Sequence, residues 1–84
     1  MEDQITDEEF LAVIVTSIVK NPKDVKIERI KDDIGVLLTL HVKKEDMGLV
    51  IGKQGVHAQA IKLFVKLFGL NHNEKTTLKI AEPD

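Results

Sequence analysis

Hydrophobic residues recur at helical spacing in some stretches of the chain and alternate with polar residues in others. The first helical stretch begins after Thr6. Thr6 and Glu9, three residues later, have the spacing of a capping box. Ile5 and Phe10 stand at the staple positions on either side of that box. Asn21-Pro22 predicts the end of the helix, because the residue before a proline avoids the helical region. The expected apolar face of this helix comprises Phe10, Val13, Ile14, Val15, Ile18 and Val19.

Two β-strands are predicted next, over residues 25–30 and 36–43, with a turn at 31–35 between them. The second strand has an apolar face and a more polar face, which is typical of a sheet with one side in water. We expect His41 to lie on the solvated side. The apolar face comprises Val36, Leu38, Leu40 and Val42.

The second half of the chain predicts two helices and a last strand. Asp46 could cap a short helix over 47–51, and Glu45 beside it suits a helix start. A longer helix follows over 56–68 and ends at Gly69, and a strand covers 76–81. The order α-β-β-α-α-β predicts an α+β domain in which three helices cover one face of a three-stranded sheet.

Length and composition favour one domain over residues 1–84, with an ordered core of about 7–81 and acidic ends. No stretch is long and apolar enough for a membrane span, and the acidic start is unlike a targeting peptide. These features, with the absence of cysteine, favour a cytoplasmic protein. The net charge is −2, yet residues 34–79 hold seven lysines against three acids. One face can therefore be basic, as contact with nucleic acid requires.

Gly52-Lys53-Gln54-Gly55 links the two helices of the second half. Glycine permits a positive φ and lets another backbone approach closely. The second glycine opens a helix, whose first N–H groups favour an anion, and Lys53 adds a positive charge. Such a loop can accept the sugar-phosphate backbone of a single strand. The alternative is a plain turn between two helices, with Lys53 an ordinary solvated lysine.

Other interpretations of the glycines fail on spacing. Gly48 and Gly52-Lys53 are one residue short of a P-loop, and Gln54 stands where Ser or Thr must hold magnesium. No dinucleotide fingerprint is formed either. The histidines lack metal-ligand spacing, and no acid–base or nucleophile arrangement is present, so we expect no enzyme activity, metal, cofactor or small-molecule substrate.

Val50-Ile51-Gly52-Lys53-Gln54-Gly55, with the helix behind it, resembles the GXXG loop of a K-homology (KH) domain. Glu45-Asp46-Met47-Gly48 and the chain length resemble the bacterial one-domain KH proteins of the KhpA (YlqC) family, over residues 7–81. The element order matches the type II KH arrangement. The resemblance implies single-stranded RNA binding in a groove between the helices flanking the loop and the last strand. The implied RNA-binding residues are Gly52, Lys53, Gln54 and Gly55, with Gly48, Ile51, Ala58, Gln59 and Lys62 as walls, Lys75 near the mouth and His57 as a further phosphate ligand.

The resemblance also implies an RNA chaperone or post-transcriptional regulator that works with a second KH protein of the KhpB (Jag-like) type. Cell length and peptidoglycan homeostasis are the implied processes. Many relatives carry basic residues where Leu49 and Val56 stand here, so we expect weaker binding and a shallower salt dependence.

The helix after the loop leaves two alternatives open. Gln59, Lys62 and Lys66 share one strip, which is either an RNA-facing surface or the solvated face of any amphipathic helix. Apolar residues cover about 220° of the same helix, more than the ~100° that a surface helix needs. The excess favours a homodimer or a heterodimer with a KH partner, and a protein adaptor is the competing function. Phe64 and Phe68 are expected in the core rather than as stacking platforms.

Overall fold

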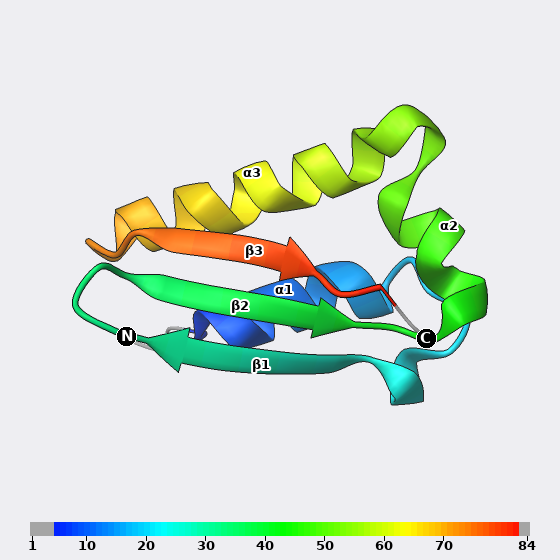
Figure 1. Cartoon of the computed structure of the whole chain (residues 1–84), viewed down its shortest axis with the longest axis horizontal. Helices are drawn as coiled ribbons and strands as arrows, with labels where there is room; N and C mark the ends of the chain where they lie inside the picture. Colours follow the sequence, from blue (N-terminus) through cyan, green and yellow to red (C-terminus); the bar gives the residue numbers. More distant parts are fainter. Residues whose placement is uncertain (1–4, 83–84) are drawn as a thin grey trace.

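The computed structural model describes residues 5–82, so Glu2, Asp3 and Asp84 of the acidic ends lie outside the described part. The α-β-β-α-α-β order and the α+β class are confirmed (Figure 1). The elements are α1 (Asp7–Thr16), β1 (Lys26–Lys31), β2 (Val36–His41), α2 (Met47–Ile51), α3 (Val56–Asn71) and β3 (Thr76–Ile80). Three 3₁₀ turns lie between them, η1 (Pro22–Asp24), η2 (Lys44–Asp46) and η3 (Lys53–Gly55).

The three strands form one mixed sheet in the order β1-β2-β3. β1 and β2 are antiparallel and are joined by a tight turn, in which the Asp32 carboxylate accepts the N–H groups of Ile34 and Gly35 at 2.8 and 3.1 Å. β3 is parallel to β2, so the chain must cross from one end of the sheet to the other. α2 and α3 make that crossing, and the loop of residues 52–55 lies in the middle of it.

The core lies between the helices and one face of the sheet. The predicted apolar face of the second strand is confirmed, because Val36, Leu38, Leu40 and Val42 are all buried. Each side chain of this size contributes roughly 1.5–3 kcal/mol when it leaves water completely. The other buried members of the core cluster are Leu11 and Val15 of α1, Val50 of α2, Ile61 and Val65 of α3, and Leu78 of β3.

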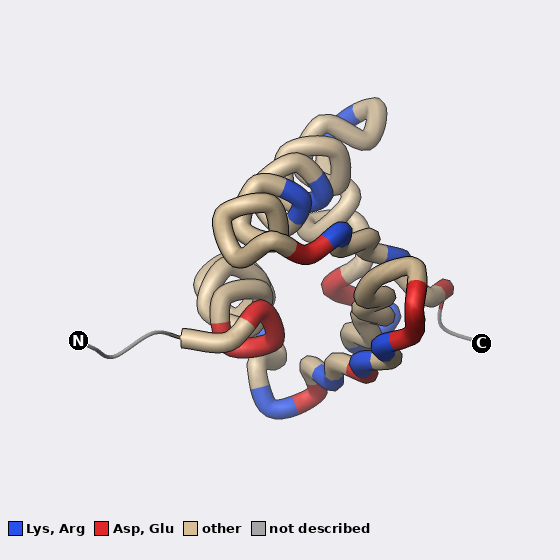
Figure 2. Tube along the Cα trace, turned by 90° about the vertical axis from the view of Figure 1, so that its left-hand side faces the viewer, with Lys and Arg blue, Asp and Glu red and all other residues tan. Residues whose placement is uncertain are grey.

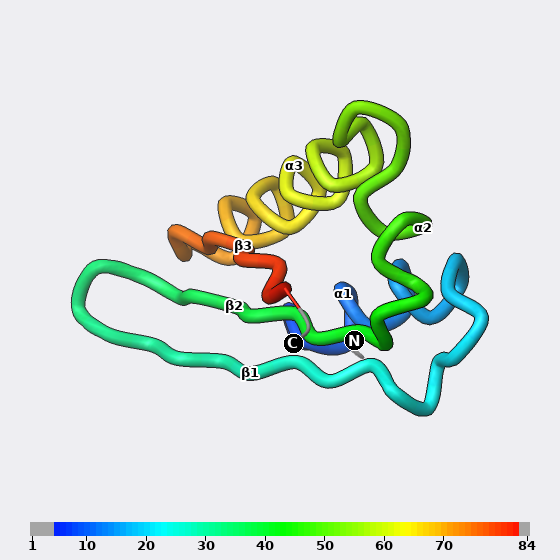
Figure 3. Tube along the Cα trace, turned by 45° about the vertical axis from the view of Figure 1, so that its right-hand side comes forward, coloured from blue at the N-terminus to red at the C-terminus, as the bar shows by residue number. Residues whose placement is uncertain are grey.

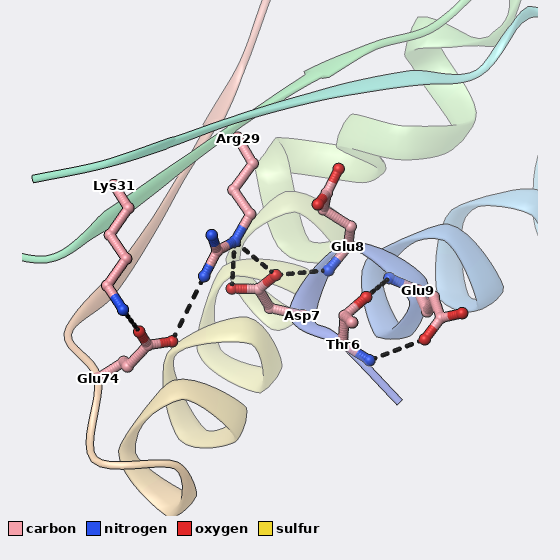
Figure 4. A network of polar contacts seen from close by, with 7 residues as sticks. All are labelled: Thr6, Asp7, Glu8, Glu9, Arg29, Lys31 and Glu74. Carbon is pink, nitrogen blue, oxygen red and sulfur yellow. Dashed lines mark hydrogen bonds and ion pairs between the residues drawn. The ribbon is translucent and has the colours of Figure 1, made fainter. Parts of the chain in front are cut away.

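Polar contacts fix the N-terminus of α1 against the sheet (Figure 4). The predicted capping box is confirmed, since Thr6 Oγ1 accepts the Glu9 N–H and Glu9 Oε1 accepts the Thr6 N–H. The buried Asp7 carboxylate accepts a hydrogen bond from Nε of Arg29 at 3.0 Å, and this contact links α1 to β1. The Arg29 guanidinium and the Lys31 ammonium reach Glu74 beyond α3, at 3.6 and 2.8 Å.

α1 is shorter than predicted and turns a different face inward. It ends at Thr16, where the Thr16 hydroxyl donates to the Ala12 carbonyl oxygen and the Ser17 hydroxyl donates to that of Val13. Hydroxyl groups that compete for helix carbonyls in this way favour an end to the helix. Leu11 joins the core, whereas Val13 is 62% exposed, so its place on the predicted buried face was wrong.

α3 is longer than predicted and extends past Gly69 to Asn71. Gly69 therefore lies inside the helix. A glycine is needed there because a Cβ would clash with Oγ1 of Thr76, at the start of β3. The core assignment of Phe64 was wrong, since this ring is 53% exposed. Phe68 is half-buried instead, stacked between the rings of Phe10 and His72 at centroid distances of 4.8 and 4.4 Å.

No helix among residues 5–82 is long and apolar enough to cross a membrane.

Candidate nucleic-acid interface

Residues 52–55 form a protruding turn at one extremity of the molecule (Figure 3). Gly52, Gln54 and Gly55 all have positive φ, at 75°, 56° and 79°. Lys53 and Gln54 are exposed at the tip of the turn. Gly55 serves as the N-cap of α3 with no side-chain hydrogen bond, so no side chain caps the first N–H groups of that helix.

The two glycines differ in the space around them. At Gly52 a Cβ would lie 2.5 Å from Cγ of His57, so the position needs both a positive φ and the absence of a side chain. At Gly55 nothing lies within 4 Å of the Cβ position. The space above Gly55 is therefore open, and a backbone could approach the start of α3 there.

His57 joins the two helices that flank the loop. Its Nδ1 lies 2.8 Å from the carbonyl oxygen of Leu49 in α2, and its ring rests on Gly52. The ring also borders a small apolar hollow between α1 and α3, of about 200 Å³, together with Ile14 and Phe64. Nδ1 is engaged with the Leu49 carbonyl oxygen, so the predicted contact of His57 with a phosphate would have to be made by Nε2 acting as an N–H donor.

Asp46 holds α2 in place, but in a way that the sequence did not predict. Its side chain makes no hydrogen bond as a helix cap, so the capping prediction was wrong. The carboxylate is completely buried and accepts the backbone N–H groups of Lys20 and Asn21 at 3.1 and 3.0 Å. Nδ2 of Asn21 donates to the same carboxylate at 3.1 Å and to Glu45 at 2.9 Å. The turn after α1 is thereby fastened to the start of α2.

The pKa of Asp46 reflects this position. Burial raises the pKa of the carboxyl, but the hydrogen bonds from Lys20 and Asn21 and the charge of Lys20 outweigh it. The net result is a pKa below the ordinary value, so the carboxylate stays ionised and keeps its hydrogen bonds.

The predicted wall residues differ in accessibility. Gly48 is exposed, and a Cβ there would meet nothing within 4 Å. Ile51 is half-buried, and Ala58 of α3 is buried, at 9% exposure. Gln59 and Lys62 are exposed on α3. The accessible part of the predicted wall therefore consists of Gly48, Ile51, Gln59 and Lys62.

Lys75, predicted near the mouth of the groove, lies at the opposite end of α3 from the loop, because β3 starts where α3 has ended. It lines a depression of about 250 Å³ between α3 and β3. Lys62 and Lys66 line the same depression, which places Lys66 beside two of the predicted site residues. The remaining lining residues are Leu70, Thr76, Thr77 and Leu78, and we call this site the basic depression.

The other histidines have local partners. His41 is on the outer sheet face, as predicted, with Nε2 2.9 Å from Glu28. Nδ1 of His72 lies 2.8 Å from the carbonyl oxygen of Phe68 at the end of α3. Within residues 5–82, no group of three His, Cys, Asp or Glu side chains is arranged to hold a metal ion.

Comparison with known proteins identifies the domain. Residues 8–80 match the family model described as KhpA/KhpB, KH domain. The chain belongs to this family. It is 43% identical over 75 residues to "RNA-binding protein KhpA" of Listeria monocytogenes, a match that covers 89% of this chain and 99% of the relative. The protein of the same name from Clostridium perfringens is 39% identical over 72 residues, or 86% of this chain and 96% of the relative.

A further KhpA relative and a solved structure extend the comparison. "RNA-binding protein KhpA" of Bacillus subtilis is 38% identical over 75 residues, covering 89% of this chain and 93% of the relative. A crystal structure of a point variant of Aquifex aeolicus Era bound to GDP.AlF4- superposes with a TM-score of 0.60 over 95% of this chain at 17% identity. The match spans 32% of the Era chain, and it supports the fold alone.

Two features of the site have no signal in the local sequence pattern. The contact between Asp46 and the turn after α1 joins residues 25 and 26 positions apart. The joint lining of the basic depression by Lys66 and Lys75 depends on how α3 packs on β3. Only the KH resemblance, which fixes the path of the chain, could have indicated them.

Proposed function

We propose that this KH-domain protein binds single-stranded RNA and that residues 52–55 clamp the RNA backbone. The observation that carries the proposal is the exposed turn with three positive φ angles at the start of α3. Such a turn lets another backbone approach closely, and KH loops of this kind clamp about four nucleotides. Relatives that cover nearly the whole chain are named RNA-binding proteins, which supports the same function.

Electrostatics support the loop as the point of phosphate contact. The start of α3 carries the positive end of the helix dipole, and Lys53 adds a full charge beside it. Lys53 and Gln54 are exposed, so their side chains can reach a phosphate without rearrangement of the core. Phosphate contacts fix the position of the strand but carry no sequence information.

We expect the affinity to be modest. Leu49 and Val56 flank the loop at 37% and 56% exposure, in positions where many relatives carry a basic residue. Each missing phosphate contact lowers the slope of log affinity against log salt by about 0.7 for a single strand. The aliphatic side chain of Ile51 offers bases a surface without aromatic stacking, which favours tolerance of sequence.

The experiment is a titration at low salt of short single-stranded RNAs against the wild type and a double variant, Lys53→Asp with Gln54→Asp. These exposed substitutions place negative charge where phosphate must sit, so binding is expected to be lost while the melting temperature holds. The matched control is Lys23→Asp with Lys26→Ala, at exposed positions away from the loop, which lowers the net charge by the same amount. Unchanged RNA binding in the loop variant would refute the clamp.

The wider role belongs to the same proposal. A chaperone or post-transcriptional regulator needs RNA contact and no chemistry on the RNA, which fits a non-enzymatic, cytoplasmic domain. The KH resemblance favours cooperation with a KhpB-type protein in control of cell length and peptidoglycan homeostasis. Single-stranded RNA and a second KH protein are therefore the proposed partners, with no cofactor or small-molecule substrate.

A second candidate function, protein adaptor, is favoured by the outer face of α3. Leu63, Phe64, Leu67 and Leu70 expose 49–56% of their surfaces, as does Val56 at the start of the helix. A continuous apolar face of this kind is typical of a protein–protein contact. Leu63→Glu with Leu67→Glu should abolish a homodimer in light scattering and leave the fold intact. If the wild type is a monomer at every protein concentration, the homodimer is excluded, and an adaptor would have to bind a different protein.

A further inference from the structure

A line of exposed apolar side chains runs along the side of α3 that faces away from the core. Their spacing alternates between four and three residues, which is the pattern by which one helix packs on another in a coiled coil. At about 100° per residue, this line lies opposite the residues that α3 buries against the domain. We call the line the outer seam, and it comprises Val56, Ala60, Leu63, Leu67 and Leu70.

The outer seam is complementary to itself in an antiparallel pair of helices. With Leu63 at the centre, such a pair places Ala60 opposite Leu67 of the second copy, so a small side chain meets a large one. Val56 meets Leu70 of the second copy in the same way. A parallel pair would set Ala60 against Ala60 and leave a gap in the packed line, which costs stability. A second copy of this chain is therefore the occupant that fits the outer seam, in an isologous dimer.

Positive charge follows one flank of the outer seam. Gln59, Lys62 and Lys66 are exposed in a strip beside it, and the two lysines line the basic depression. Figure 2 shows basic and no acidic segments along α3, the upper helix in that view. Among the described residues, no carboxylate lies within ion-pair distance of Lys62 or Lys66. The strip therefore keeps its charge for a polyanion.

The symmetry of an antiparallel pair decides where the two strips lie. Its twofold axis is perpendicular to both helices and reverses their direction, but it keeps each flank on the same side of the pair. Both strips therefore face one side of the dimer, about 8–10 Å apart, as the axes of packed helices are. RNA segments bound along the two copies run in opposite directions, because the same rotation relates them. A parallel pair would place the strips on opposite sides of the dimer.

We infer that two copies of this chain pair antiparallel through the outer seam and promote the annealing of complementary RNA strands. The inference rests on the proposed RNA binding and adds an activity that requires the pair. The two strands of a duplex are antiparallel, and the dimer presents two RNA segments in that relative orientation on one side. Holding both strands raises the effective concentration of each near the other. The lysines of both copies also offset the repulsion between the two phosphate backbones.

Single cysteines test the orientation of the pair, since the chain has no cysteine of its own. In the antiparallel pair, Val56→Cys mixed with Leu70→Cys should form a disulfide on mild oxidation. Leu70→Cys alone should not, because its two copies lie about 21 Å apart along the helices. A disulfide in Leu70→Cys alone, in place of the mixed one, would show a parallel pair and overturn the inference.

The activity is tested by annealing two labelled complementary RNAs, followed by fluorescence energy transfer. The variant is Leu63→Gln with Leu67→Gln, which removes the centre of the outer seam without adding charge. The matched control is Ile30→Gln with Ile34→Gln, at exposed isoleucines of β1 and the turn after it. We expect the wild type and the control to speed annealing at least about tenfold over RNA alone. The seam variant should lose this acceleration while its affinity for either single strand changes less than about twofold.

The outcomes separate this inference from the proposed function. If the wild type binds single strands but does not speed annealing, the proposed function stands and the inference is wrong. The inference is also wrong if the seam variant, monomeric by analytical ultracentrifugation, anneals RNA as fast as the wild type. A wild type that stays monomeric with and without RNA overturns it as well. If the wild type binds no single strand at low salt, the proposed function itself fails.

Discussion

The imidazole ring of His57 occupies the space that a Cβ of Gly52 would enter, with Cγ of the ring 2.5 Å from that Cβ position. Its Nδ1 reaches back to the carbonyl oxygen of Leu49 at 2.8 Å. A side chain at the start of α3 is thereby hydrogen-bonded to the backbone of α2. The conformation of residues 52–55 depends on this contact as well as on the glycines.

Gly52→Ala should destabilise the domain by about 2 kcal/mol, because the residue must keep a positive φ and its Cβ would overlap the His57 ring. Gly48→Ala is the matched control, since it lies in α2 with open space around its Cβ position. Alanine is favoured over glycine in a helix by roughly 0.5–1 kcal/mol, so this control should be neutral or stabilising. Urea denaturation of both variants measures the difference. Equal losses at the two positions would contradict the role of the His57 contact.

His57→Phe and His57→Ala together separate packing from hydrogen bonding. Phenylalanine keeps a ring against Gly52 and loses the bond to Leu49, which should cost about 1 kcal/mol. Alanine loses both, so the amides of residues 52–55 should exchange their hydrogens faster than in the phenylalanine variant. Hydrogen exchange by mass spectrometry on the loop peptide makes the comparison. Identical exchange in the two variants would mean that the ring itself does not hold the loop.

Local signals of the sequence predicted much of this fold. The capping box at Thr6 and Glu9 and the apolar face of β2 depend on neighbours within a few residues, and both are confirmed. The start of α3 is also correct, because glycine ends one helical pattern and begins the next. Such signals suffice where short-range geometry decides the structure.

The errors occur where long-range contacts decide it. Asp46 looked like a cap by position, but its carboxylate is taken by the turn after α1. Gly69 looked like a helix end, but a strand packs against it. No periodicity within one element contains this information.

Phe64 and Phe68 provide a test of which aromatic ring supports the fold. Phe68 stacks on Phe10 and His72, and such a pair is worth about 0.5–1.5 kcal/mol beyond the area that it buries. We therefore expect Phe68→Ala to cost at least about 2 kcal/mol. Phe64→Ser, at a ring 53% exposed, should change the free energy of unfolding by no more than about 0.5 kcal/mol. Thermal melts of the two variants at equal protein concentration decide between them, and a reversed order would place Phe64 in the core after all.

Asp46 should make the stability of the domain depend on pH in the acidic range. Its pKa is lowered in the folded protein relative to the unfolded chain, so folding favours the ionised form. The stabilisation is therefore complete above the ordinary carboxyl value of about 4, and it is lost as the pH falls through the lower folded pKa. Asp46→Asn keeps the size of the side chain but replaces one carboxylate oxygen by an NH₂ group. Because NH₂ only donates, the amide cannot accept the backbone N–H groups of Lys20 and Asn21 on separate oxygens as the carboxylate does.

The variant should consequently melt well below the wild type at neutral pH, and the gap should narrow as the pH approaches about 3. Glu45→Gln is the control, because this neighbouring exposed carboxylate accepts one bond from the side chain of Asn21 and none from the backbone. Its melting temperature should stay close to that of the wild type at neutral pH. A gap between Asp46→Asn and the wild type that stays constant from neutral to acidic pH would show that the ionised carboxylate does not hold α2 and the loop behind it.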